Sequence, residues 1–224
     1  MIRPAMIRIV LINPNTSAAT TAMMVGIAQA AAPPGVGIIG ATARRGVPMI
    51  LEAAELAAAA AEVVEIGLRH ADSADGIVIG AFGDPGLVAL RRRTTVPVAG
   101  LCEAAMREAA AGGRRFGVAT VTPGLAGPIA ARARDLGLAH LYAGIRLTPE
   151  PPAALAADPP ALEAALAAAV ELCIRRDGAA AVVIGGGPLG AAARALAERW
   201  EVPVIAPVPA ALRALLRAFA AGGA

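Results

Sequence analysis

The sequence predicts an α/β protein with two similar lobes, each built on a parallel β-sheet, related by pseudo-two-fold symmetry with a cleft between them. Apolar runs of strand length alternate with helical patterns along the whole chain, which is typical of parallel sheets covered on both faces. The series strand, glycine-rich turn, helix and strand also occurs twice. Its copies begin as GIVIGAFGDPGL at 76–87 and AVVIGGGPLG at 181–190, and each leads to an apolar run that opens on Val-Pro.

The first repeat begins with the apolar run at 7–12, a strand that ends in Asn13-Pro14-Asn15-Thr16-Ser17. Residues of these types end a strand and begin a helix, so a helix follows to about Ala32. Turns rich in glycine and proline separate the remaining patterns, and glutamates at helical spacing mark the solvent face of the longest one. These patterns predict strands at 36–41, 77–80 and 96–101, and helices at 51–70 and 104–111.

The second repeat runs through the same alternation and ends in one additional helix. Its patterns predict strands at 115–120, 144–147, 181–185 and 202–206, and helices at 125–136, 160–176, 190–199 and 209–220. Ala81 and Gly186, each the first residue after the strand glycine of its repeat, are 105 residues apart. We therefore place the first lobe at 1–103 together with 207–224, and the second lobe at 104–206.

Composition and charge exclude several classes of function. The net charge is +3 over 224 residues and aromatic residues make up 2% of the chain, so the basic groove and stacking platforms that bind nucleic acid are scarce. The two cysteines, with isolated His70 and His140, make neither a disulfide framework nor a metal site. No apolar run is long and clean enough to span a bilayer or to act as a secretory signal. We expect a cytoplasmic protein without a metal.

The ends of the predicted strands bring several polar loops together. Ligands of open parallel sheets bind beyond the carboxyl ends of the strands, and two facing lobes would join these ends in one cleft. Backbone N–H groups and Asn, Thr and Ser side chains would form its walls, which suits a small anionic or amide-rich ligand. The loops concerned are 13–17, 81–84, 102–103, 120–122 and 186–190.

Four segments stand in order along nearly the whole chain: LINPNTS at 11–17, FGDPGL at 82–87, LCEAAM at 101–106 and VPVIAPV at 202–208. Together they resemble the hydantoin racemase branch of the aspartate/glutamate/hydantoin racemase superfamily. The resemblance implies an isomerase that transfers a proton, without a cofactor, at the α-carbon of a hydantoin-like or amino-acid-like small molecule. It also implies two catalytic cysteines, one on each face of the substrate, with the active site between the lobes. We expect a small-molecule substrate and a homo-oligomer, and neither nucleic acid nor a membrane as a partner.

The positions that match the two cysteines are Ala81 and Gly186, and neither residue carries a functional group. Inverting a stereocentre needs a base on one face of the carbon and an acid on the other. We therefore expect catalysis that is non-standard or reduced. The alternative is a non-catalytic binder of small molecules, or the inactive partner of an active paralogue.

Two neighbouring residues, Cys102 and Glu103, are the candidates to replace the missing groups, because they follow the fourth predicted strand at the rim of the cleft. Each also has a structural interpretation. Cys102 would then be a small buried core residue, and Glu103 would cap a helix or hold a loop.

The binding residues of the family have clearer counterparts in this chain. The resemblance assigns substrate binding to side chains in both lobes and to backbone N–H groups in the two glycine-rich turns. Asn13 could instead tie its own turn, and Asp84 could act as an N-cap or in an Asx turn. The candidates are Asn13, Asn15, Thr16, Ser17, Phe82, Gly83, Asp84, Thr120 and Gly187.

One rival interpretation comes from the glycines of the second turn. Gly185, Gly187 and Gly190 satisfy the G-x-G-x-x-G pattern that follows a strand in dinucleotide-binding folds. However, Pro188 occupies the turn, and the next predicted strand does not end in the acidic residue that would hold a ribose. The sequence therefore favours a site without a nucleotide cofactor.

Overall fold

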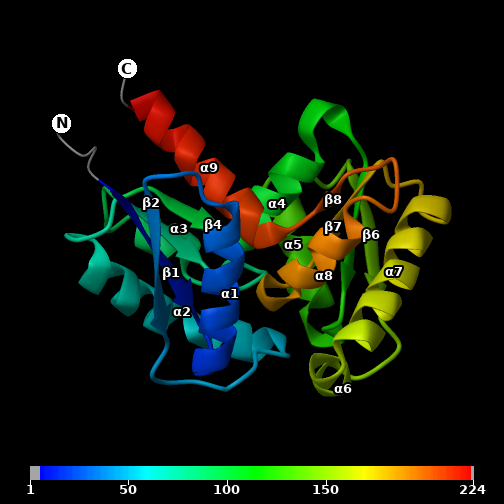
Figure 1. The fold of residues 1–224 in the computed structure, drawn as a ribbon, viewed down its shortest axis with the longest axis horizontal. Coiled ribbons are helices and arrows are strands. Elements are labelled where there is room, and N and C mark those ends of the chain that lie inside the picture. The colour runs from blue at the N-terminus through cyan, green and yellow to red at the C-terminus, as the bar shows by residue number, and fades with distance from the viewer. Residues whose placement is uncertain (1–5, 223–224) are drawn as a thin grey trace.

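A computed structural model describes residues 6–222 as two α/β lobes side by side (Figure 1). The first sheet holds β1 (Ile7–Asn13), β2 (Val36–Thr42), β3 (Gly76–Ile79) and β4 (Val98–Gly100) in the order β2-β1-β3-β4. The second holds β5 (Phe116–Thr120), β6 (Tyr142–Leu147), β7 (Ala181–Ile184) and β8 (Val204–Ile205) in the order β6-β5-β7-β8. All neighbouring strands are parallel. The identical strand orders confirm the prediction of two similar parallel-sheet lobes.

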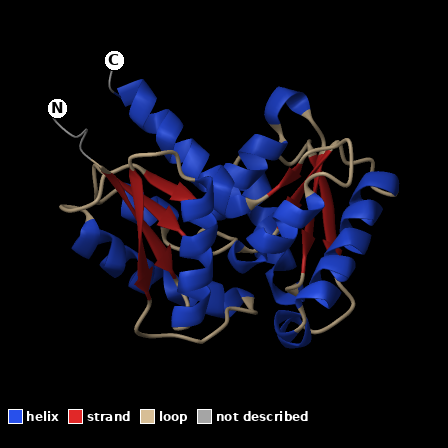
Figure 2. Ribbon diagram, in the orientation of Figure 1, coloured by secondary structure: helices blue, strands red, loops and turns tan. Residues whose placement is uncertain are grey.

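Helices flank both sheets, as Figure 2 shows. The first lobe carries α1 (Ala18–Ala31), α2 (Ala53–His70) and α3 (Leu87–Arg91), and α4 (Leu101–Ala109) leads into the second lobe. The second lobe carries α5 (Ala126–Asp135), α6 (Pro152–Ala157), α7 (Pro159–Arg175) and α8 (Gly190–Leu196). The last helix, α9 (Pro207–Gly222), returns to the first lobe and packs on α4 and α1.

Alternating side chains of β1 show why its apolar sequence forms a buried strand. Ile9 and Leu11 pack into the core that contains α1 and α9, whereas Val10 and Ile12 pack into a second core beside α2. All four are 1% exposed or less. Successive strand residues point to opposite faces, so a strand covered on both sides has apolar residues at every position.

One core joins the two lobes. It contains Val78 and Ala99 of the first sheet, Val118 and Val183 of the second, and residues of α1, α4, α5 and α9. Helix α4 lies at its centre, because it packs against α9, α5 and β7. The expected division between residues 103 and 104 falls inside this helix, so the exact lobe boundaries stay a prediction.

Two predictions of local structure were wrong in detail. The strand expected at 96–101 ends at Gly100, and the helix expected from residue 104 begins at Leu101. The cause is Asp84, distant in sequence, whose carboxylate accepts the backbone N–H groups of Cys102 and Glu103 and so caps the helix. The sequence patterns did not predict helix α6. Among residues 6–222, no helix has the length and apolar character to cross a membrane.

Candidate active site

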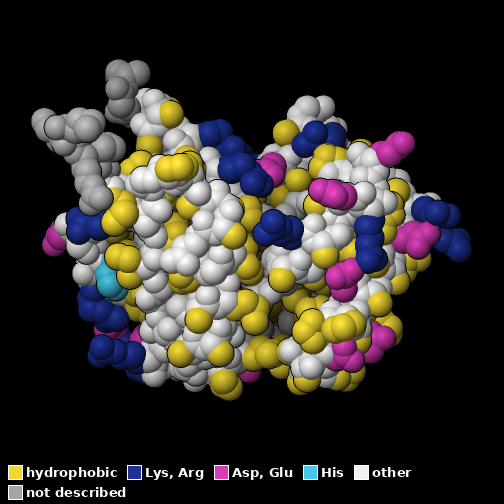
Figure 3. All heavy atoms as spheres, in the orientation of Figure 1, with side chains coloured by type: hydrophobic (Ala, Val, Ile, Leu, Met, Phe, Trp, Pro, Cys, Tyr) yellow, Lys and Arg dark blue, Asp and Glu magenta, His cyan; other side chains and the backbone are white. Residues whose placement is uncertain are grey.

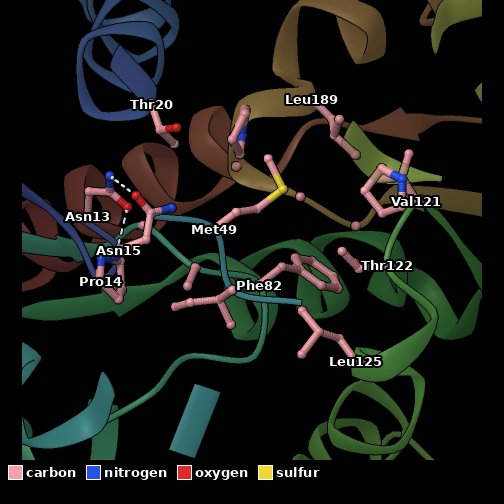
Figure 4. A pocket seen from close by; sticks show the side chains of 18 of the residues that line it. Asn13, Pro14, Asn15, Thr20, Met49, Phe82, Val121, Thr122, Leu125 and Leu189 are labelled. Carbon is pink, nitrogen blue, oxygen red and sulfur yellow. Dashed lines mark hydrogen bonds between the residues drawn. The ribbon is translucent and has the colours of Figure 1, made fainter. Parts of the chain in front are cut away.

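A cavity of about 200 Å³ lies between the lobes, at the carboxyl ends of the strands (Figure 4). The first lobe supplies the turns after β1 and β3 and the loop before α2. The second supplies the loops after β5 and β7, with part of α6 and α7. Hydrophobic side chains gather around the junction of the lobes on the face in Figure 3. The lining residues are Asn13, Pro14, Asn15, Thr20, Met23, Met49, Ile50, Leu56, Gly80, Ala81, Phe82, Val121, Thr122, Leu125, Pro152, Ala156, Leu162, Gly185, Gly186, Gly187, Pro188 and Leu189.

Asn13 holds the turn after β1 together. Its side chain is 1% exposed, and its Nδ2 donates to Asn15 Oδ1, to the Ser17 carbonyl and to Thr21 Oγ1 at 2.8–3.0 Å. Its Oδ1 accepts the backbone N–H of Asn15. These bonds engage the amide of Asn13 within the turn, so Asn13 shapes the wall of the cavity.

Asn15 is the side chain of this turn that is free to meet a ligand. Its Oδ1 accepts from Asn13 Nδ2 and from the Ser17 backbone N–H, which fixes the amide plane. Within the described residues its Nδ2 has no hydrogen-bond partner, and Asn15 lines the cavity. Ser17 instead caps α1 by accepting the N–H of Thr20, and neither Ser17 nor Thr16 lines the cavity.

The turn after β3 presents backbone to the cavity. Ala81 and Phe82 line it, and within the described part of the chain their N–H groups donate to no protein acceptor. The ring of Phe82 reaches across to the second lobe, where a Cβ placed on Gly185 would lie 3.3 Å from its Cε1. Gly83 turns away at φ +141°, beneath Leu56, and does not line the cavity.

Gly186, the counterpart of Ala81, lines the same cavity from the second lobe. Its φ of 176° is extended backbone, so this position accepts any residue type without backbone strain. The next residue, Gly187, lies against the first lobe, where an added Cβ would meet Met24 Sδ at 2.5 Å and the Gly80 carbonyl at 3.2 Å. The two glycine-rich turns therefore meet at the cavity, and Ala81 and Gly186 both line it.

Thr120 supports the second turn from behind. Its side chain is fully buried, and its Oγ1 donates to the Gly185 carbonyl at 2.6 Å. Thr120 does not line the cavity, and its expected contact with substrate stays a prediction. Thr122, which lies 3.2 Å from Thr120 between the hydroxyl oxygens, lines the cavity in its place.

Asp84, expected to bind substrate, is turned away from the cavity. It is the one non-glycine residue of the described chain with positive φ, at 54°, and this backbone directs its carboxylate under α4. There it accepts the N–H groups of Cys102 and Glu103 at 2.8 and 2.7 Å and pairs with Arg132 at 3.2 Å. Burial raises the pKa of Asp84 to about 6, against the opposing effect of these donors. Its role is to cap a helix, with its cap partners 18 and 19 residues away.

Cys102 and Glu103, the candidates to replace the catalytic thiols, do not line the cavity. Cys102 is completely buried beside Met106, and burial raises the pKa of its thiol well above the usual value. Glu103 pairs with Arg132 and Arg91 at 2.7 and 2.9 Å. Burial acts to raise the pKa of Glu103, but the arginine charges outweigh it and hold the pKa below its usual value. A protonated buried thiol and a carboxylate of lowered basicity are poor proton carriers.

The lining of the cavity consists of hydrogen-bonding and apolar groups. No side chain that lines it, among the described residues, is titratable. Its polar groups are amides, threonine hydroxyls and free backbone N–H groups, and the rest of the wall is apolar. In residues 6–222, no group of three His, Cys, Asp or Glu could hold a metal ion. Such a lining favours a small neutral molecule rich in amide groups over a charged one.

The model of the Asp/Glu/hydantoin racemase family matches residues 9–215. The chain belongs to this family. Hydantoin racemase of Paenarthrobacter aurescens is 32% identical over 208 residues, 92% of this chain and 88% of that protein. The structure of allantoin racemase from Klebsiella pneumoniae is 33% identical with a TM-score of 0.91, covering 96% of this chain and 89% of that one. Allantoin racemase from Pseudomonas fluorescens, 28% identical, has the same TM-score and covers 96% and 92%.

Sequence reasoning missed several cavity residues of this racemase-family chain. Thr20 follows Ser17 by one helical turn, and this spacing signals that its side chain faces the same turn. Met49, Leu125 and Leu162 carried no such signal, because they lie in a loop, a short 3-10 turn and a helix face whose orientation depends on the tertiary fold.

Proposed function

We propose that this chain binds a small neutral cyclic amide of the hydantoin class in the cavity between its lobes, and that two-thiol racemisation does not operate there. The observation that carries the proposal is the contrast within one cavity. Its hydrogen-bonding groups are in place, whereas Ala81 and Gly186 stand at the two lining positions that the family resemblance assigns to proton carriers. The proposal selects binding without family-type catalysis from the alternatives that the sequence left open.

The ligand class follows from the chemistry of the wall. A hydantoin ring is uncharged at neutral pH and presents two carbonyl acceptors and two N–H groups. Asn15 Nδ2 and the N–H groups of Ala81 and Phe82 match the carbonyls, and each good hydrogen bond is worth about 0.5–1.5 kcal/mol. The relatives named as hydantoin and allantoin racemases support a ring of this kind. A free amino acid would bury two charges against a wall without a charged partner.

The proposed lack of racemisation is supported by the cavity lining, which contains no titratable side chain among the described residues. A base and an acid must each reach the reacting carbon, and one such group contributes roughly 10²–10⁴-fold to a rate. The titratable side chains that the sequence suggested as substitutes or as ligand contacts, Asp84, Cys102 and Glu103, are engaged in the helix cap, the core and the arginine pairs. Bound ligand therefore meets no protein group that could remove its α-proton.

Calorimetric titration tests the proposal by comparing the affinity for 5-substituted hydantoins with the affinity for the matching ring-opened N-carbamoyl amino acids. Both series share the same side chain, but the opened compound carries a carboxylate. We expect saturable binding of the hydantoin and at least about tenfold weaker binding of the opened form, a difference of about 1.4 kcal/mol. Tighter binding of the carboxylate, or no binding of any hydantoin, would refute the proposal.

A further inference from the structure

The loop before α2 crosses the cavity as a strap, defined here as residues 47–52. Its first carbonyl, that of Val47, accepts the N–H of Thr16 at 3.0 Å. At its other end the N–H groups of Leu51 and Glu52 donate to Glu55 Oε2 at 2.8 and 3.1 Å. Between these anchors, residues 48–50 belong to no helix or strand and form no backbone hydrogen bond within the described chain.

Met49, at the middle of the strap, lies in the cavity. Figure 4 shows its side chain among Asn15, Phe82 and Leu189. It lines the wall and is also 40% exposed, so one side faces the ligand space and the other faces solvent. A flexible thioether adapts to groups of different shape. Met49 is therefore placed to contact whatever substituent a ring carries and to close the space behind it.

The far end of the strap rests on the second lobe at Gly124. A Cβ placed on Gly124 would lie 2.4 Å from both the Leu51 carbonyl oxygen and Glu52 Oε2. A side chain could be accommodated only if the strap moved away, because the Leu51 carbonyl is backbone. Gly124 has no positive φ, so its backbone conformation does not require glycine. Glycine instead allows the strap to approach the backbone of the second lobe closely.

We propose that the strap is a movable cover for the cavity, that its closed position depends on the contact with Gly124, and that Met49 sets the size of ring substituent that the cavity accepts. The inference rests on the proposed function for the nature of the ligand. The strap is hydrogen-bonded at both ends and forms no backbone hydrogen bond in its middle. It reaches from the first lobe to the second. Opening it would expose the cavity without breaking either sheet.

The first test substitutes Gly124→Ala, with Gly127→Ala as the matched control. Gly127 lies three residues further on, and its added Cβ would meet nothing within 4 Å. Hydrogen exchange of peptides covering 47–52 needs no ligand. We expect faster exchange in Gly124→Ala than in wild type and unchanged exchange in Gly127→Ala. Equal exchange in all three proteins would show that the strap is a fixed wall and would overturn the proposal.

The second test measures dissociation constants of 5-methylhydantoin and 5-benzylhydantoin for wild type and Met49→Ala. Removing the Met49 side chain opens space behind the ring, so we expect the ratio of the two constants to shift by about tenfold in favour of the benzyl compound. Equal weakening of both ligands would deny Met49 a role in size selection. If wild type binds neither hydantoin, the proposed function fails, whereas the exchange measurement still decides the movable cover.

Discussion

Asp84 of the first lobe and Arg132 of the second lie 3.2 Å apart, carboxylate to guanidinium, beneath the loop that carries Ala81 and Phe82. The Asp84 side chain is fully buried and that of Arg132 is 13% exposed. The same carboxylate caps α4. The Asp84 side chain therefore connects the turn after β3 with helix α4 and with the second lobe. These contacts hold the two walls of the cavity in a fixed relative position.

Asp84→Asn is expected to lower the free energy of unfolding at pH 7 by about 1–3 kcal/mol, because an amide nitrogen would face one of the two buried N–H groups that the carboxylate now accepts. Urea denaturation measures the change. Asp135→Asn, an exposed aspartate on the same helix as Arg132, is the control and should stay within about 0.5 kcal/mol of wild type. Equal stability of all three proteins would contradict the coupling role.

The pH dependence of this difference has a definite sign. The folded-state pKa of Asp84, about 6, lies above its ordinary value of 3.8, so the folded chain binds this proton more tightly than the unfolded chain does. The associated stability is complete below pH 3.8 and is lost as pH rises through about 6. We expect the stability advantage of wild type over Asp84→Asn to narrow between pH 4 and 7, by up to about 3 kcal/mol. Widening over that range would show that Arg132 lowers the pKa instead.

Thr120→Val tests the support behind the second turn. Valine keeps the shape of threonine but leaves the Gly185 carbonyl without its 2.6 Å hydrogen bond. The expected cost is about 1–3 kcal/mol of unfolding free energy, with weaker ligand binding as a secondary effect of the displaced turn. Thr120→Ser keeps the hydroxyl and should retain most of both. Thermal and calorimetric measurements that rank the valine variant equal to wild type would remove this role.

Asn15→Asp tests the hydrogen bond that Asn15 is proposed to donate to the ligand. The substitution retains an oxygen to accept from Asn13 and Ser17 but replaces the free Nδ2 donor with a second oxygen. Stability should stay close to wild type, whereas hydantoin affinity should fall by about tenfold or more, since a carboxylate oxygen would face a ring carbonyl. Unchanged affinity would place the ring elsewhere in the cavity.

The sequence predicted the two-lobe fold well because its evidence is local and repeated. Apolar runs on β1 and β3, glycine-rich turns and the 105-residue offset depend on near neighbours in the chain. The side-chain roles were harder to predict. Asp84 caps a helix that starts at Leu101, and Thr120 bonds to a carbonyl 65 residues away, so both roles depend on contacts that exist only after folding. Cys102 follows the fourth strand as predicted, but it lies in the first turn of α4 with its side chain buried in the core.

Cysteines can be introduced at Ala81 and Gly186, the two positions that the family resemblance assigns to catalytic thiols. Ala81 already carries a Cβ, and Gly186 has extended backbone, so a side chain there must displace only the end of Leu189, which would lie 2.8 Å away. Deuterium exchange at C5 of a bound hydantoin is expected in the double variant Ala81→Cys with Gly186→Cys and to be slower in either single variant. If the double variant binds the hydantoin but causes no exchange at C5, the two positions do not flank the ring.

Hydantoin binding without a proton carrier is the proposed property of this cavity. It is tested most directly by following C5–H exchange of 5-benzylhydantoin in heavy water by NMR, with wild-type protein at a concentration that calorimetry shows to be saturating. We predict that bound ligand exchanges no faster than ligand in buffer alone. Exchange at an enzymatic rate, about 1–10³ per second, would contradict the account and would require a base that reaches the cavity from outside its present lining.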